Sequence, residues 1–117
     1  MLPAAHRLHR AADFTEVVRR GRRASRPLLT VHLLAGGDPT APPRAGLVVS
    51  KAVGGSVVRH RTARRLRHLL LPRLATLDEG TRLVVRAQPG AGAAPSSALA
   101  VDLDEALAAA TRPRSPR

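Results

Sequence analysis

KAVGGSVVRHRTARRLRHLLLP, from Lys51 to Pro72, is the stretch around which this chain of 117 residues is organised. After Gly54 and Gly55 the pattern predicts a helix, with Ser56 as its N-cap and Pro72 as its stop. Five side chains fall within one arc of about 120°, the stripe that an amphipathic helix buries: Val58, Thr62, Leu66, Leu69 and Leu70. One side of this helix is therefore expected to pack against the rest of the protein.

The opposite arc of this helix is basic and carries no acid. It holds His60, Arg61, Arg64, Arg67 and His68, with Arg59 and Arg65 at its boundaries. Like charges three or four residues apart on a helix repel each other by about 0.2–0.5 kcal/mol, so together they favour a polyanion that lies against them. A solvated charged face is the alternative, but such faces normally mix both signs. We therefore expect contact with nucleic acid.

The composition favours the same kind of partner. The formal net charge is +12, from 20 Lys and Arg against 8 Asp and Glu, and a field of that size concentrates polyanions. All but one of the basic residues are Arg, which binds phosphate through two hydrogen bonds. The absence of Cys excludes disulfides and thiolate metal sites. No apolar run approaches the roughly 20 residues of a membrane span, and we expect a cytoplasmic protein.

Followed from the N-terminus to the C-terminus, the sequence pattern predicts one α+β domain over residues 1–111 and a basic, disordered tail over 112–117. A short helix is expected over Ala11–Arg20, with Gly21 at the position that favours a left-handed conformation. Strands are expected at Leu28–Leu34, Ala45–Ser50 and Arg82–Ala87, and a last helix from Ser96 or Ser97 to about Thr111. This order predicts helices packed against a small mixed sheet.

A second basic cluster follows the first helix: Arg19, Arg20, Arg22, Arg23 and Arg26. The acids of the last helix, by contrast, are expected to face away from the polyanion and to serve solubility; they are Asp102, Asp104 and Glu105.

The residues do not predict an active site in the protein itself. His60 and His68 lie about 12 Å apart along the helix axis, too far to act jointly on one phosphate. His6 and His9 are a weak pair of metal ligands, and the acids show no sign of converging on two metal ions. Phe14 is the only aromatic residue, so a stacking platform of the kind that single-strand binders use is absent. On its own, Phe14 is more readily a core residue than a ligand contact.

At the central helix a family resemblance is also visible. A series of residues here resembles the signature of the bacterial ribonuclease P protein subunit: Lys51, Gly54, Val57, Arg59, Arg61, Arg64 and Arg67. The strand-like segment AGLVVS, residues 45–50, precedes it. That family has an Arg-Asn-Arg triplet followed by Lys-Arg and a further Arg on the same helix. Here His60 stands where Asn is usual, and Ala63 stands where Lys is usual. Arg7-Leu8 and Asp13-Phe14 resemble the family's N-terminal pattern.

The resemblance implies an αβββαβα two-layer sandwich with a left-handed βαβ crossover in a small mixed sheet. It implies that the protein binds the ribonuclease P RNA and the 5′ leader of precursor tRNA, and assists Mg²⁺-dependent removal of the leader. The RNA and its Mg²⁺ are then the catalyst, and the protein binds no cofactor. RNA contacts are expected at Lys51, Arg59, His60, Arg61, Arg64, Arg65, Arg67 and His68. A leader cleft is expected at Arg7, Phe14 and Val18, the last standing where a second aromatic is usual.

Two other interpretations remain open. A small ribosomal protein of similar α+β build would bind ribosomal RNA and have no substrate. A DNA-binding domain could use the 57–71 helix for recognition, but a strand directly before it leaves no room for the first helix of a helix-turn-helix. We therefore expect RNA as the partner, and neither DNA nor a membrane.

Overall fold

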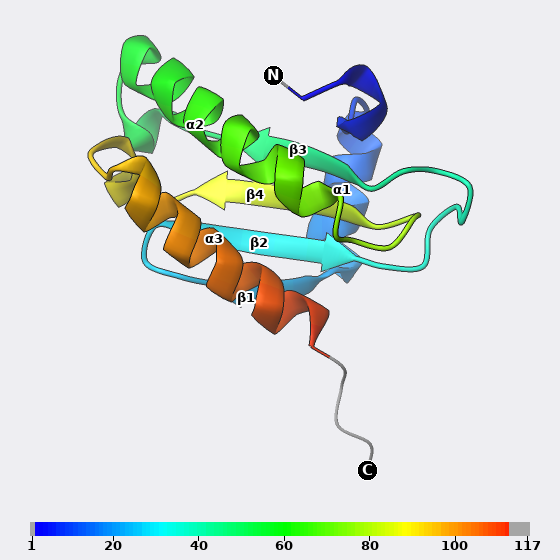
Figure 1. The fold of residues 1–117 in the computed structure, drawn as a ribbon. Helices are drawn as coiled ribbons and strands as arrows, with labels where there is room; N and C mark the ends of the chain where they lie inside the picture. Colours follow the sequence, from blue (N-terminus) through cyan, green and yellow to red (C-terminus); the bar gives the residue numbers. More distant parts are fainter. Residues whose placement is uncertain (1, 113–117) are drawn as a thin grey trace.

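The computed structural model describes residues 2–112, and its elements run in the expected αβββαβα order (Figure 1). The helices are α1 (Ala11–Arg20), α2 (Ser56–Leu74) and α3 (Ser96–Thr111). The strands are β1 (Arg22–Ser25), β2 (Leu29–Leu34), β3 (Arg44–Val48) and β4 (Arg82–Ala87). Short 3₁₀ helices lie at η1 (Ala4–His6), η2 (Lys51–Val53) and η3 (Pro89–Gly92). Of the predicted tail 112–117, only Arg112 lies within the described residues.

The four strands form one mixed sheet in the order β1-β2-β4-β3, in which β4 runs antiparallel to β2 and parallel to β3. Helices α2 and α3 cover one face of the sheet, and α1 covers part of the other (Figure 1). In this view β3 and β4 both point left, and α2 lies in front of them. The chain passes from β3, the upper strand, through α2 to β4, the lower strand. The β3-α2-β4 crossover is therefore left-handed, as the resemblance implies and against the general rule for such units.

The main core lies between the sheet and the helices α2 and α3, and its buried side chains are aliphatic. Its fully buried side chains include Leu29, Val31, Leu66, Leu70, Leu83, Val85, Leu99 and Leu103. A smaller cluster on the other face joins α1 to the sheet through Leu8, Val17 and Val84. One face of α3 packs into this core, and its buried residues are Leu99, Leu103, Ala106, Leu107 and Ala110.

The residue pattern does not predict β1 as a strand. Three of its four residues are polar, and only Ala24 is buried, so no alternation of apolar residues marks it. It is an edge strand that pairs with β2 alone. Gly21, just before it, has φ −75°, so the predicted left-handed conformation is wrong. A Cβ atom at Gly21 would lie 2.5 Å from the Val17 carbonyl oxygen, so close approach of the backbone explains this glycine.

The predicted ends of α2 are also wrong. Gly55 is the N-cap, and Ser56 is the first helical residue and makes no capping hydrogen bond. Pro72 lies inside the last turn, and the helix continues to Leu74. A proline at this point removes one hydrogen bond to the carbonyl four residues earlier. That carbonyl belongs to His68, on the exposed side of the helix, where water can replace the bond, and burial of Leu74 favours the extra turn.

We predict that Leu66→Ala lowers the free energy of unfolding by about 2–5 kcal/mol, because it removes a fully buried side chain and leaves a cavity. Chemical denaturation measures the loss. Arg64→Ala, on the exposed side of the same helix, is the control and should change stability by less than about 0.5 kcal/mol. Similar losses in both variants would mean that α2 is rotated differently from the structure described.

Candidate nucleic-acid interface

The rotation of α2 on the sheet determines which of its basic side chains reach the surface. Thr62, Leu66 and Leu70 are buried, and the Thr62 hydroxyl donates a hydrogen bond of 2.8 Å to the Val58 carbonyl oxygen. His60, Arg64 and His68 are exposed on the opposite side. Leu69, expected in the buried stripe, is only partly buried. The packing side and the basic side are therefore separated as the periodicity predicts.

Arg61 and Arg65 are an exception, because their guanidinium groups contact the loop around η3. Arg61 Nη2 donates to the Gly92 carbonyl oxygen at 3.0 Å, and Arg65 Nη1 donates to the Ala94 carbonyl oxygen at 3.0 Å. Both side chains are half-buried, whereas Arg61 is expected in the exposed arc. Long arginine side chains can bend back to such acceptors while part of the group stays in water. These two residues hold the loop to α2 as well as contributing charge.

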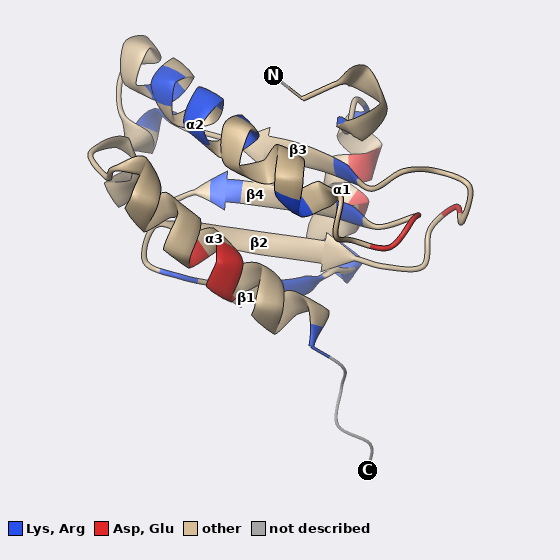
Figure 2. Ribbon diagram, viewed as in Figure 1, with Lys and Arg blue, Asp and Glu red and all other residues tan. Residues whose placement is uncertain are grey.

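The arginines of α2 from Arg59 to Arg67 form no ion pair with any acid in residues 2–112. The ion pairs in this part of the chain lie elsewhere: Arg20–Glu16, Arg26–Glu105, Arg73–Asp104 and Arg82 with Asp13 and Glu16. Figure 2 shows the same separation, with basic segments along α2 and acidic segments on α3, on α1 and in loops. This helix consequently carries positive charge that only an external anion can neutralise.

Four of the predicted RNA-contact residues line one hollow on the surface of α2. Its lining consists of Val57, His60, Arg61, Ala63, Arg64 and Arg67. Ala63, where the resembled family usually has Lys, leaves this hollow open between the arginines. Lys51 is exposed in η2, before the helix, while Arg59, Arg65 and His68 lie outside the hollow.

A second, smaller pocket of about 170 Å³ lies at the β3 edge of the sheet and joins the two predicted sites. Arg67 of α2 lines it together with Arg7 and Phe14. The Phe14 ring lies directly against the backbone of Gly46, where a Cβ atom would be 2.3 Å from the ring carbons. Arg7 is held at this edge by an isolated parallel bridge to Ala45. The pocket therefore combines one half-buried aromatic ring with two cationic side chains.

Val18 does not line that pocket. It is half-buried and packs with the small cluster of Leu8, Val17 and Val84. The side chain at position 18 therefore belongs to the contact between α1 and the sheet, and the structure does not bring it together with Arg7 and Phe14 in one pocket.

The sheet face on the α1 side holds a polar group that the sequence interpretation did not single out. His32 is 7% exposed, and its Nδ1 has no hydrogen-bond partner among the described residues. Burial lowers the pKa of His32, and the guanidinium groups of Arg23 and Arg86 lower the pKa further. Strand alternation was the available signal, because in the predicted strand Leu28–Leu34 residues two apart share a face, which separates His32 from the apolar Val31 and Leu33.

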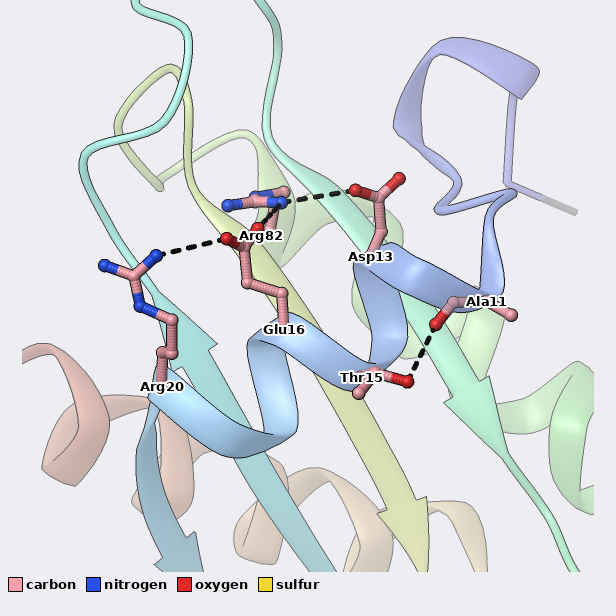
Figure 3. Close-up of polar contacts among 6 residues, drawn as sticks. All are labelled: Ala11, Asp13, Thr15, Glu16, Arg20 and Arg82. Atoms are coloured by element: carbon pink, nitrogen blue, oxygen red, sulfur yellow. Dashed lines mark hydrogen bonds and ion pairs between the residues drawn. The ribbon is translucent and has the colours of Figure 1, made fainter.

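A clamp of ion pairs fixes α1 on the sheet (Figure 3). Arg82, at the start of β4, contacts Glu16 at 2.6 Å and Asp13 at 3.3 Å, and Arg20 contacts Glu16 at 3.1 Å. The hydrogen bond from Arg82 and its charge hold the pKa of Glu16 below its ordinary value. The clamp positions the helix that carries Phe14.

The acids of α3 make structural contacts, which corrects their expected role in solubility alone. Asp102 accepts a hydrogen bond of 2.9 Å from the Leu28 backbone N–H. Asp104 pairs with Arg73 at 2.6 Å, and Glu105 pairs with Arg26 at 3.5 Å. These contacts connect α3 to the end of α2 and to the β1–β2 turn.

The described histidines and carboxylates do not gather into a metal site. His6 Nδ1 contacts the Pro43 carbonyl oxygen, and His9 Nε2 contacts the Ala4 carbonyl oxygen. Within residues 2–112, no three His, Cys, Asp or Glu side chains converge as ligands. In the same part of the chain, no helix is both long and apolar enough to cross a membrane.

A basic helix with unpaired arginines, seated in a left-handed βαβ unit beside a cationic aromatic pocket, defines a small α+β RNA-binding protein. Comparison with known proteins gives the family. The family model described as Ribonuclease P matches residues 2–111, and the chain belongs to this family.

Relatives in sequence and solved structures of similar fold both carry this family's description. A ribonuclease P protein component of Streptomyces griseus is 59% identical over 92% of this chain and 93% of its own length. One from Thermobifida fusca is 51% identical over 97% of this chain and 82% of its own length. The solved ribonuclease P proteins of Staphylococcus aureus and Thermotoga maritima superpose with TM-scores of 0.78 and 0.73. They cover 91% and 94% of this chain, and the chain covers 95% and 99% of theirs, at 20% and 18% identity.

We predict that Arg64→Ala affects RNA binding alone, whereas Arg61→Ala affects both RNA binding and the stability of the fold. Arg64→Ala should weaken RNA binding and lower the slope of log K against log salt by about 1, with stability unchanged. Arg61→Ala should weaken binding as well, but should also cost about 1 kcal/mol of stability because its bond to the loop is lost. Salt-dependent binding and thermal unfolding measure the two effects. A nearly flat salt dependence in the unsubstituted protein would contradict the electrostatic interpretation.

We predict that Glu16→Gln flattens the loss of stability at acid pH. Because the folded-state pKa of Glu16 is lowered, its stabilising contribution is present above its ordinary value of about 4.3 and disappears as pH falls through the folded value. Unfolding measured from pH 6 down to pH 3 tests this. Glu79→Gln, in the exposed turn before β4, is the control. An acid limb equally steep in Glu16→Gln and the unsubstituted protein would show that the clamp contributes nothing to folding.

Proposed function

We propose that this chain is the protein subunit of a ribonuclease P and that its α2 helix docks on the ribonuclease P RNA. The observation that carries the proposal is that the α2 arginines from Arg59 to Arg67 form no ion pair in the described structure, on a chain of this family. Phosphate groups of RNA complement this surface, because each bound Lys or Arg releases condensed counterions. The ribosomal-protein alternative has no support in the family match.

We further propose that the pocket of Arg7, Phe14 and Arg67 takes part of the 5′ leader of precursor tRNA. An aromatic ring beside guanidinium groups suits a single strand, since a base can stack on the ring while phosphates contact the cations. The pocket adjoins the α2 hollow through Arg67. A leader strand bound in the pocket would therefore lie next to the RNA-docking surface. Val18 would support α1 rather than contact the leader.

In this proposal the RNA is the catalyst. The acids among residues 2–112 are used in ion pairs and turns or are dispersed over the surface, and they do not fit a two-metal centre. We assign the Mg²⁺ that the reaction requires to the RNA. The contribution of the protein is to bind RNA and to position the leader strand.

The dependence on RNA is directly testable. We predict that the isolated protein does not cleave precursor tRNA with any divalent metal. Addition of the ribonuclease P RNA should give cleavage at lower Mg²⁺ than the RNA alone requires, because arginine side chains replace screening ions. Cleavage by a preparation free of RNA would refute the proposal that the RNA is the catalyst.

The leader pocket has its own test. We predict that Phe14→Ala weakens binding of precursor tRNA to the assembled complex by about 1–3 kcal/mol, the contribution of one base stacked on an aromatic ring. Mature tRNA, which lacks the leader, should bind as before. The measurement is the ratio of the two affinities, with Val18→Ala as a comparison on the same helix. An unchanged ratio with an intact fold would remove the leader pocket from the account.

A further inference from the structure

A second basic surface lies at the opposite edge of the sheet from β3 and the hollow on α2. It comprises Arg19, Arg20, Arg22, Arg23 and Arg112, and we call it the β1-edge surface. Arg22 donates a hydrogen bond to the carbonyl oxygen of Arg112, which joins two chain segments ninety residues apart. Figure 2 shows basic segments on β1 and at the C-terminal end of α3 next to it.

Most of this charge has no internal partner. Within residues 2–112, only Arg20 of this set forms an ion pair, with Glu16. Arg19, Arg23 and Arg112 are exposed and Arg22 is half-buried. Asp78 and Asp104 line the same hollow as Arg20, Arg22 and Arg112, but neither forms an ion pair with them in the described structure, and Asp104 is paired with Arg73.

The two basic surfaces are too far apart to act as one. The order β1-β2-β4-β3 places three strand spacings between the edges, about 14 Å before side chains are counted. Charges separated by more than about 8 Å are largely screened at physiological salt. A polyanion held on α2 therefore leaves the charge at the β1 edge unneutralised.

The chemistry of the β1-edge surface favours RNA over an acidic protein. Protein interfaces have a fully buried apolar core with aromatic residues, whereas the exposed large apolar side chains of the described chain are Val57, Leu71 and Val101, on α2 and α3. Arg20, Arg22 and Arg112 do border a hollow, but the leucines that line it are buried or half-buried. Phosphate backbones need only positioned cations.

We propose that the β1-edge surface binds the phosphate backbone of a second RNA segment, so that the protein bridges two RNA segments from opposite edges of its sheet. This proposal rests on the proposed docking of α2 on the ribonuclease P RNA. We assign the second segment to the same ribonuclease P RNA, because the precursor tRNA is already engaged at the β3 edge through the proposed leader pocket. Thr111-directed cuts in the precursor tRNA alone would overturn this assignment.

Directed cleavage of the RNA tests the proposal, because the chain has no Cys and a single introduced Cys is therefore a unique site of attachment. An iron–EDTA reagent is tethered at Thr111→Cys, beside Arg112, or at the exposed Val57→Cys on α2. Each full-length protein is assembled with end-labelled ribonuclease P RNA, and in a second arm with labelled precursor tRNA as well. We expect Val57-directed cuts in one RNA segment and Thr111-directed cuts in another.

The double variant Arg19→Gln/Arg112→Gln should abolish the Thr111-directed cuts, keep the Val57-directed ones, and lower the salt slope of RNA binding by about 2. Arg10→Gln/Arg86→Gln removes the same charge from other exposed positions and should keep both sets of cuts. The proposal is overturned by the absence of Thr111-directed cuts, by cuts that survive the double variant, or by cuts confined to the 5′ leader. Loss of the Val57-directed cuts alone would instead count against the proposed function.

Discussion

Burial of Thr62, Leu66, Leu70 and Leu74 against the core fixes the rotation of α2, and the rest of the interface depends on it. A helix repeats its faces every 3.6 residues, so once this stripe is packed, His60, Arg64 and His68 can only face outward. The left-handed crossover then places this outward face along the β3 edge, where Arg67 lines the same pocket as Arg7 and Phe14. The packing of these leucines in the core therefore determines which arginines of α2 reach the surface.

The shortage of acids gives the second constraint. With 8 carboxylates for 20 Lys and Arg, most cations cannot be paired internally. The carboxylates that form ion pairs in the described structure lie on α1 and α3. They hold α1 to β4, and α3 to the ends of α2 and β1, so internal pairing stabilises the scaffold and leaves the helix surface of α2 to an external anion.

Periodicity predicted α2, α3 and the strand β4 because each carries a clear apolar repeat, and the family resemblance supplied the order and the crossover. Periodicity could not predict β1, whose single buried residue is Ala24. It also could not predict the hydrogen bonds of Arg61 and Arg65 to the η3 loop, because those depend on a contact between distant segments. Gly46 shows the same limit: its role is to admit the Phe14 ring, and nothing in the local sequence indicates that.

The central claim is that α2 presents a preformed cationic face to RNA while Arg61 and Arg65 keep their backbone acceptors. A structure of the protein bound to ribonuclease P RNA tests this most directly. We expect RNA phosphate oxygens within hydrogen-bond distance of the Arg64 and Arg67 guanidinium groups, with the Arg61–Gly92 and Arg65–Ala94 contacts retained. RNA bound only at other surfaces, with α2 facing solvent, would contradict the account.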